Sequence, residues 1–295
     1  MQVKFHIGFG KRVVKELPVS PNQNGIFLKG SNGSTVILIH GLTGTPNEMK
    51  FLANFLNKKG YSVACPRLAN HDQPLDILKN TKWQEFYQSV KDAFLNVNTG
   101  SSGKIFVAGL SMGALFSLLL AEEFPDKVSG VSCLSPTLFY DGWNTTWMKH
   151  LLPLVYFSGL RHFLYFKEDP PYGVKNEGVR RMIARYYKKA GFSDLSEASQ
   201  FGYPYFPVNS LYQLDLSVKY LIKRLGRINT PVQLIQAKED DMTSVKNSEF
   251  IYNRVNSSVK EMVLLEDSYH VITADQERDK VAQKMLEFFE RINGK

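Results

Sequence analysis

The stretch that decides the fold is Ile105-Phe106-Val107-Ala108-Gly109-Leu110-Ser111-Met112-Gly113-Ala114. Its first four residues are branched or apolar, like a buried strand, and residues 112–124 have a helical pattern that ends before Pro125. A serine on a sharp strand-to-helix turn has strained backbone angles, and glycines two residues to either side relieve the crowding. The pattern therefore predicts that Ser111 holds its hydroxyl exposed above a sheet.

Glycine and serine are common residues, so Gly-x-Ser-x-Gly alone occurs by chance in about one chain in ten of this length. The surrounding elements carry the prediction. Runs of branched apolar residues without polar alternation, typical of parallel strands covered on both faces, occupy 36–39, 128–133, 232–235 and 262–265. Helical patterns occupy 48–59, 83–97, 211–225, 244–255 and 271–292. This alternation predicts an α/β fold with a mostly parallel central sheet flanked by helices, to which segments around Val13 and Ile26 add antiparallel edge strands.

Composition narrows the class of protein. The chain has 295 residues, 43% of them hydrophobic and 22% charged, which suits one compact globular enzyme. We expect a cytoplasmic location, because no signal peptide or apolar run of bilayer length is evident and because Cys65 and Cys133 are typical of reduced thiols. The formal net charge is +8, but no nucleic-acid-binding motif accompanies it, so nucleic acid is not an expected partner.

The alternation of strands and helices breaks at 138–208, which is aromatic and irregular. We interpret this segment as an inserted helical cap, or lid, over a core formed by 1–137 and 209–295. Residues 139–230 contain 13 Lys and Arg against 7 Asp and Glu, a net charge of +6. Two further features of the cap leave alternatives open. One is a cluster of basic residues, Arg180, Arg181, Arg185, Lys188 and Lys189. This cluster suits either a solvated helix face or contact with an anionic membrane or a phosphate-bearing substrate. The apolar run 151–157 either packs the cap onto the core or lines an acyl tunnel.

A glycine-rich loop follows the predicted strand 36–39, with the sequence His40-Gly41-Leu42-Thr43-Gly44-Thr45-Pro46. Such a loop can present backbone N–H groups without steric hindrance. Together with the residue after the serine, it predicts an oxyanion hole formed by the N–H groups of Leu42 and Met112. Each donor is worth on the order of 3 kcal/mol in the barrier. His40 could act as a base, but its position favours bracing this loop by hydrogen bonds.

An acid and a base are expected downstream of Ser111, in that order. His270 follows the predicted strand 262–265 and is expected to open the final helix, so it is the candidate base. Asp240 and Asp241 follow the strand 232–235. We predict that Asp240 orients His270 and stabilises its imidazolium form, while Asp241 faces water.

These residues resemble one known family. The strings that carry the resemblance are His40–Pro46, Gly109–Gly113, Gln236–Met242 and Asp267–Asp275. They are similar to the bacterial carboxylesterase/monoacylglycerol lipase family of the α/β-hydrolase superfamily. The resemblance implies that fold, a catalytic role for the first aspartate of the Asp240 loop, and an oxyanion N–H at Leu42. The chain departs from the family at Asn70 and Asp72, which replace glycines, and the resemblance is poor across the cap.

The expected reaction is the cleavage of carboxylic esters through an acyl-enzyme, with Ser111, His270 and Asp240 as the triad. We expect short to medium acyl chains, with monoacylglycerols among the candidate substrates, and no metal or organic cofactor. One alternative is a thioesterase or acyltransferase whose basic cap holds a phosphate-bearing acyl carrier. A second is a non-catalytic ligand-binding module that keeps the fold. Self-association into a homodimer stays open at this point.

Overall fold

The computed structural model describes residues 25–100, 103–145, 150–190 and 202–294. A seven-stranded sheet has the order β1-β3-β2-β4-β5-β8-β9. Only its first pair, β1 with β3, is antiparallel; each other neighbouring pair is parallel. The strands are β1 (Ile26–Leu28), β2 (Thr35–Ile39), β3 (Ser62–Cys65), β4 (Ile105–Leu110), β5 (Val128–Leu134), β8 (Val232–Ala237) and β9 (Lys260–Leu265).

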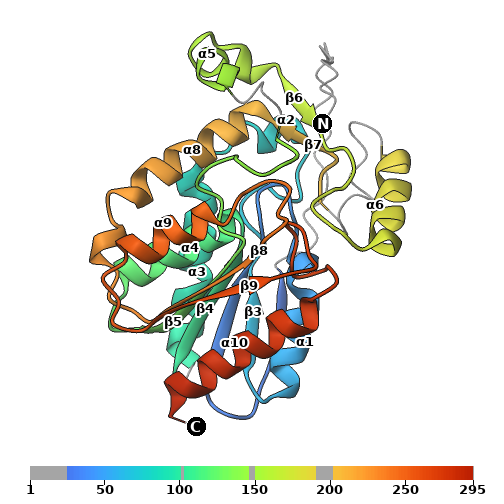
Figure 1. Ribbon diagram of the computed structural model, residues 1–295. Coiled ribbons are helices and arrows are strands. Elements are labelled where there is room, and N and C mark those ends of the chain that lie inside the picture. The colour runs from blue at the N-terminus through green and yellow to red at the C-terminus, as the bar shows by residue number, and fades with distance from the viewer. Residues whose placement is uncertain (1–24, 101–102, 146–149, 191–201, 295) are drawn as a thin grey trace.

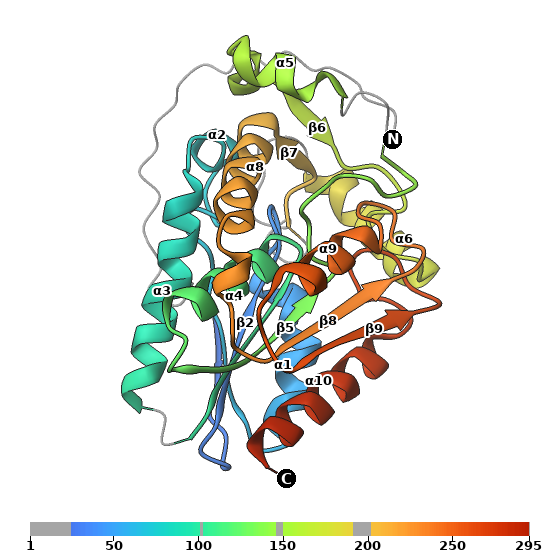
Figure 2. The same cartoon turned by 60° about the vertical axis from the view of Figure 1, so that its left-hand side comes forward.

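Helices cover both faces of this sheet (Figures 1 and 2). One face packs against α1 (Lys50–Lys58) and α10 (Arg278–Asn293). The other packs against α3 (Trp83–Gly100), α4 (Met112–Glu123), α8 (Val208–Ile222) and α9 (Lys246–Arg254). Because both faces are covered, the central strands are buried along their whole length, which explains their uninterrupted apolar sequences.

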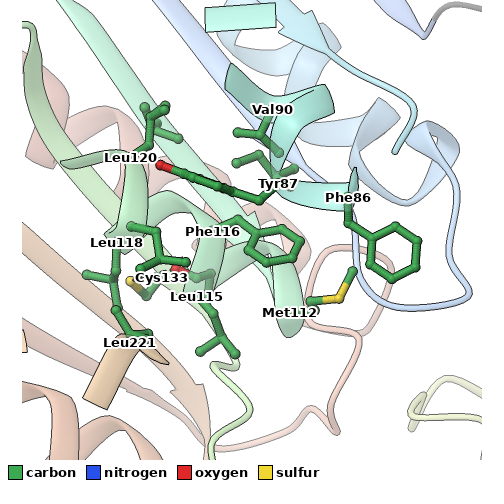
Figure 3. Close-up of a cluster of buried hydrophobic side chains, with 14 of the residues drawn as sticks. Phe86, Tyr87, Val90, Met112, Leu115, Phe116, Leu118, Leu120, Cys133 and Leu221 are labelled. Atoms are coloured by element: carbon green, nitrogen blue, oxygen red, sulfur yellow. Dashed lines mark hydrogen bonds between the residues drawn. The ribbon is translucent and has the colours of Figure 1, made fainter. Parts of the chain in front are cut away.

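Helix α4 is the centre of the larger core. Every residue from Met112 to Ala121 is buried, as expected of a helix that is apolar on all sides. Figure 3 shows Phe116 of α4 beside Tyr87 of α3, and their ring centroids are 5.7 Å apart. Burying a side chain of this size contributes roughly 1.5–3 kcal/mol, so the helix behind Ser111 is firmly held.

The segment between β5 and α8 forms elements outside the main sheet. They are α5 (Leu152–Phe157), η3 (Leu160–His162), β6 (Tyr165–Lys167), α6 (Glu177–Ala190) and β7 (Tyr205–Pro207), with β6 and β7 paired antiparallel. In Figure 1, α5 lies at the top of the molecule, α6 at its right-hand side, and β6 and β7 between them. We propose 138 and 208 as the boundaries of this cap. The remaining short helices are η1 (Pro46–Met49), α2 (Leu75–Leu78) and η4 (Leu225–Arg227).

The predicted fold class and the antiparallel edge strand at Ile26 are confirmed, while Val13 lies outside the described residues. One strand was not predicted, and one prediction of local structure is wrong. Strand β3 carries no run of bulky branched residues and was not expected. The final helix begins at Arg278, because 271–277 form turns, so His270 lies in a loop and does not open that helix.

Neither interpretation of the apolar run 151–157 fits its most exposed residues. Leu154 and Phe157 are 69% and 89% exposed, so they neither pack on the core nor line a tunnel, whereas Tyr156 is buried. We call the exposed apolar side chains of this region the apolar tip. Its members are Leu151, Leu154, Phe157, Leu160 and Phe163.

The strand order places the site. From β2 the chain adds β3 on one side and β4 on the other, which makes the β2–β4 boundary a topological switch point. Crevices at the carboxyl ends of strands beside such a point are where open α/β sheets bind ligands. The His40 loop follows β2 and Ser111 follows β4, so both lie at this place. No helix in the described part of the chain is long and apolar enough to span a bilayer.

Candidate active site

Ser111 sits on the strained turn that the sequence predicts. Its φ of 57° and ψ of −115° place it in a region that L-residues rarely adopt. Its N–H donates to the carbonyl oxygen of Leu134 at 2.9 Å, which anchors the turn to β5. Such strain persists only where the surroundings enforce it.

The two flanking glycines are required by space. A Cβ at Gly109 would lie 2.2 Å from the backbone of Gly113, and a Cβ at Gly113 would lie 2.2 Å from the carbonyl oxygen of Ile39. The helix therefore passes directly against β4 and β2. This close approach is the physical reason for the Gly-x-Ser-x-Gly spacing.

Asp240 and His270 form a buried pair. The Nδ1 atom of His270 lies 2.9 and 3.1 Å from the two carboxylate oxygens of Asp240. Because a carboxylate faces Nδ1, that nitrogen carries the proton and Nε2 has a free lone pair. The N–H groups of Met242 and Thr243 donate to Asp240 at 2.9 and 2.8 Å, and Gln236 donates at 2.7 Å. The carboxylate is thus fixed by its own loop and by the end of strand β8.

The expectation that Asp241 faces water is wrong. Its side chain is 3% exposed, and its carboxylate accepts the backbone N–H of His270 at 3.3 Å. The reason lies far away in the sequence: the backbone at Gly142 packs directly on that of Asp241, and Asn144 donates its N–H to the Asp241 carbonyl oxygen. Burial raises the pKa of Asp241 to about 6, although nearby His270 acts to lower it.

The carboxylates also determine the basicity of His270. Burial alone would lower the pKa of this imidazole, but the charges of Asp240, Asp241 and Glu48 outweigh burial and raise it above the ordinary value. A base with a raised pKa accepts a proton more readily.

Ser111 and His270 line one cavity, but they are not hydrogen-bonded to each other. Instead, the Ser111 Oγ lies 2.8 Å from the hydroxyl of Thr137, a buried residue just after β5 that sequence reasoning missed. The Nε2 atom of His270 is buried and has no hydrogen-bond partner among the described residues. This lone pair is therefore available to a hydroxyl that turns towards it.

His40 braces the glycine-rich loop, as predicted. It is fully buried; its Nε2 accepts the N–H of Leu68 at 3.2 Å, so its Nδ1 must carry the proton that binds the Gly41 carbonyl oxygen at 2.9 Å. Burial and neighbouring His71 hold the pKa of His40 well below its ordinary value, which keeps this tautomer neutral. The carbonyl of Gly41 and the N–H of Leu42 belong to one peptide plane, so the brace fixes the direction of that N–H.

Asn70 stands where the family that the sequence resembles has a glycine, and its backbone keeps a conformation that glycine favours. Asn70 has a φ of 59°, the left-handed region that asparagine tolerates better than most residues. Its side chain donates to Thr81 at 2.9 Å. The hydroxyl of Tyr203 donates to the carbonyl oxygen of Gln73 at 2.6 Å, which links this loop to the segment before β7.

The cavity measures about 490 Å³ and lies between the core and the cap. Its core side includes Leu42, Ser111 and His270. Its cap side is mostly apolar and aromatic, and it is formed by Tyr172, Val174, Val179, Ile183, Tyr187 and Phe206. The cap is tied to the histidine loop, because the Val271 N–H donates to the Gly173 carbonyl oxygen at 2.7 Å.

Two carboxylates of this cavity were not anticipated, Glu48 and Glu168. Burial raises the pKa of each to about 7. The hydroxyl of Tyr187 donates to Glu168 at 2.7 Å. No sequence pattern points to either acid. In the described ranges, no group of three or more His, Cys, Asp or Glu residues is arranged to hold a metal ion.

Comparison with known proteins identifies the family of the chain. A family model described as "Serine aminopeptidase, S33" matches residues 30–277. The thermostable monoacylglycerol lipase of Bacillus sp. (strain H-257) is 29% identical over 88% of this chain and 91% of its own length. The carboxylesterase of Bacillus subtilis (strain 168) is 27% identical over 88% of this chain and 93% of its own.

A solved structure reported with the metagenome-derived lipolytic enzymes LipS and LipT has a TM-score of 0.72. It is 24% identical, and the match covers 93% of this chain and all of that one. At this identity the likeness shows a shared fold. The family match covers most of the chain, including every residue of the site just described. The chain belongs to the S33 serine aminopeptidase family of α/β-hydrolases.

Proposed function

We propose that this protein is a serine hydrolase that cleaves carboxylic esters, with Ser111 as nucleophile, His270 as general base and Asp240 as its partner. The observation that carries this proposal is the strained Ser111 turn, which shares one cavity with a buried, hydrogen-bonded His270–Asp240 pair. The relatives named monoacylglycerol lipase and carboxylesterase support ester cleavage over the other reactions of the fold.

The reaction begins when the Ser111 hydroxyl turns from Thr137 to Nε2 of His270, which takes its proton as Oγ attacks the ester carbonyl. The N–H groups of Leu42 and Met112 stabilise the oxyanion. His270 then gives its proton to the departing alcohol, and water repeats the sequence on the acyl-enzyme to release the acid. Asp240 stabilises the imidazolium form of His270 in both halves.

The charges of the cavity favour an uncharged ester, with an acyl chain of short to medium length. Among the described residues that line it, Glu48 and Glu168 are acidic, and Lys50 is the one lysine or arginine. The basic side chains of α6 lie outside that lining, while Val179 and Ile183 of the same helix line it. A phosphate-bearing acyl carrier would gain nothing from this arrangement within the cavity. Monoacylglycerols fit it, because they join an uncharged alcohol to an apolar chain.

A panel of p-nitrophenyl esters from acetate to palmitate, measured on the wild type and on Ser111→Ala, tests the proposal. We expect turnover of the shorter esters and a loss of about 10⁴-fold or more in Ser111→Ala. Acyl-CoA and aminoacyl p-nitroanilide substrates are the matched alternatives. Turnover of either much faster than of any ester, or an unchanged rate in Ser111→Ala, would overturn the assignment.

We also propose that the cap makes peripheral contact with anionic membranes, with the apolar tip entering the interface. Residues 142–167 contain no Asp or Glu; Arg161 lies within the tip, where it donates to Asn209, and Lys167 follows it. Apolar side chains with nearby cations are the combination that binds anionic interfaces. A homodimer paired through the same apolar tip is the competing proposal, since either partner would cover these exposed side chains.

Sedimentation with phosphatidylcholine vesicles, with and without phosphatidylglycerol, distinguishes the two. We expect binding that needs phosphatidylglycerol and that weakens about tenfold in the double variant Phe157→Ser/Phe163→Ser. Phe27→Ser is the matched control, because Phe27 is 67% exposed on edge strand β1. The opposite result is a wild type that does not bind vesicles and sediments as a dimer, together with a double variant that sediments as a monomer. That result would reject the membrane contact in favour of the homodimer.

A cytoplasmic location is part of the same proposal. Cys65 and Cys133 are both free and buried, which suits a reducing compartment. Fractionation of cells that express the chain, followed by detection with an antibody, checks it. Recovery from an exported fraction would contradict it.

A further inference from the structure

Glu48 lies beside the glycine-rich loop that carries the proposed oxyanion donor. It belongs to η1, directly after that loop, and its side chain turns back so that Oε2 accepts the N–H of Gly41 at 3.0 Å. The same side chain lines the cavity that holds Ser111. A carboxylate beside an apolar cavity is costly to desolvate, so its retention needs a compensating role.

The contacts on either side of Gly41 fix two successive peptide planes. His40 binds the carbonyl oxygen of Gly41, and so holds the plane that carries the N–H of Leu42. Glu48 binds the N–H of Gly41, and so holds the preceding plane. Because the two planes share one Cα atom, a rotation at Gly41 would redirect the N–H of Leu42 away from the oxyanion.

Gly44 leaves the room that Glu48 occupies. A Cβ at Gly44 would lie 2.2 Å from Oε2 and 2.4 Å from Cδ of Glu48. The backbone of Gly44 is outside the left-handed region, so an alanine there is strained by the carboxylate alone. The Glu48 carboxylate therefore occupies its position only because residue 44 has no side chain.

The charge of Glu48 acts on the same site. The titratable groups that interact with it from the surrounding elements are His270 in the loop after β9, Glu168 in the cap and Tyr187 on α6; Lys50 on α1 lines the cavity as well. An ionised Glu48 raises the pKa of His270, which favours the imidazolium that forms as Ser111 attacks.

We propose that Glu48 is a positioning residue of the reaction: it holds Gly41 so that the Leu42 N–H stays aimed at the oxyanion, and its carboxylate supports the His270 imidazolium. The inference rests on the proposed ester hydrolysis and deepens it. In this role Glu48 acts through Gly41 and through the charge that His270 experiences.

Four variants test it: Glu48→Gln, Glu48→Ala, Gly44→Ala and the double variant Gly44→Ala/Glu48→Ala. Glu48→Ala removes the acceptor for Gly41, and we expect kcat for p-nitrophenyl butyrate to fall about 10- to 100-fold while KM stays within about threefold. Glu48→Gln keeps an acceptor oxygen and removes the charge. Its kcat at the pH optimum should stay within about fivefold of wild type, and the acid limb of kcat/KM should move to lower pH.

The double variant separates this role from simple packing. Gly44→Ala displaces the carboxylate, so its loss in kcat should not add to that of Glu48→Ala. Glu85→Ala is the matched control, because Glu85 also accepts a backbone N–H, from Lys82 at 2.8 Å, outside the cavity. Wild-type kcat in Glu48→Ala, a change in KM alone, additive losses, or an unmoved acid limb in Glu48→Gln would each overturn the inference. Failure of the wild type to cleave any ester would instead overturn the proposed function.

Discussion

The core side and the cap side of the cavity differ in how the chain fixes them. On the core side, Asp240 is held by donors from its own loop, Met242 and Thr243, and by Gln236 at the end of the preceding strand β8. On the cap side, the lining is mostly apolar, and the apolar tip beyond it is exposed. Hydrogen bonds between residues close in sequence thus fix the proposed catalytic carboxylate. The space for substrate is instead shaped by cap side chains that follow no sequence pattern.

The largest expected effect distinguishes the two adjacent aspartates of the core side. Asp240→Asn should lower kcat about 10⁴-fold, because the amide would favour the wrong tautomer of His270. Asp241→Asn should cost about tenfold or less, since Asp241 binds only the backbone of His270. Steady-state kinetics on p-nitrophenyl butyrate measure both. Equal losses, or the reverse order, would show that the acid is assigned wrongly.

His40→Ala should have the next largest effect. It removes the hydrogen bond to the Gly41 carbonyl oxygen and the one that the Leu68 N–H donates to the ring, and we expect kcat to fall about 10²-fold with little change in KM. Thermal unfolding, followed by circular dichroism, controls for loss of structure. A variant that unfolds at the wild-type temperature and retains full kcat would remove His40 from the account.

The pH profile tests the carboxylates around His270. Only the neutral imidazole can take the Ser111 proton, so kcat/KM should fall as pH drops through the pKa of His270. That pKa is raised, so the acid limb should lie above about 6.5, the ordinary histidine value. Asp241→Asn removes one of the charges that raise it and should move the limb to lower pH. A limb below the ordinary value in the wild type would contradict the described electrostatics.

The cap side should respond through substrate choice. Ile183 is 8% exposed and lines the cavity. Ile183→Trp should lower kcat/KM for the longest accepted ester about tenfold and leave p-nitrophenyl acetate within about twofold, because filled space excludes methylenes. Met182→Trp, on the adjacent residue that is 45% exposed, is the control. An equal loss on all esters would mean that the cap side also supports the chemistry.

The smallest effect concerns the resting contact of the nucleophile. Thr137→Val removes the hydroxyl that lies 2.8 Å from Ser111 Oγ and keeps the side-chain shape. One neutral hydrogen bond is worth about 1 kcal/mol, so kcat should rise by up to about fivefold if this contact competes with His270. A fall of similar size would show that Thr137 assists Ser111 during the reaction.

The difference between the core side and the cap side of the cavity also explains how much of the structure could be predicted from the sequence. The sheet, the Ser111 turn and the order of Asp240 and His270 follow from patterns within short segments, and the fold class they predicted is confirmed. The burial of Asp241 could not be predicted, because the backbone around Gly142 that covers it is distant in sequence. Glu168 reaches the cavity only through the path of the cap, for which no periodic pattern exists.

The central claim is that Ser111 is the nucleophile activated by His270 and Asp240. Labelling with a fluorophosphonate, followed by tryptic mass spectrometry, tests it most directly, because Ser111 lies in the peptide 105–127. We predict a single adduct at Ser111 that is absent in Ser111→Ala and forms far more slowly in Asp240→Asn than in Asp241→Asn. An adduct on another serine, such as Ser117 in the same peptide, or labelling that persists in Ser111→Ala, would contradict the account.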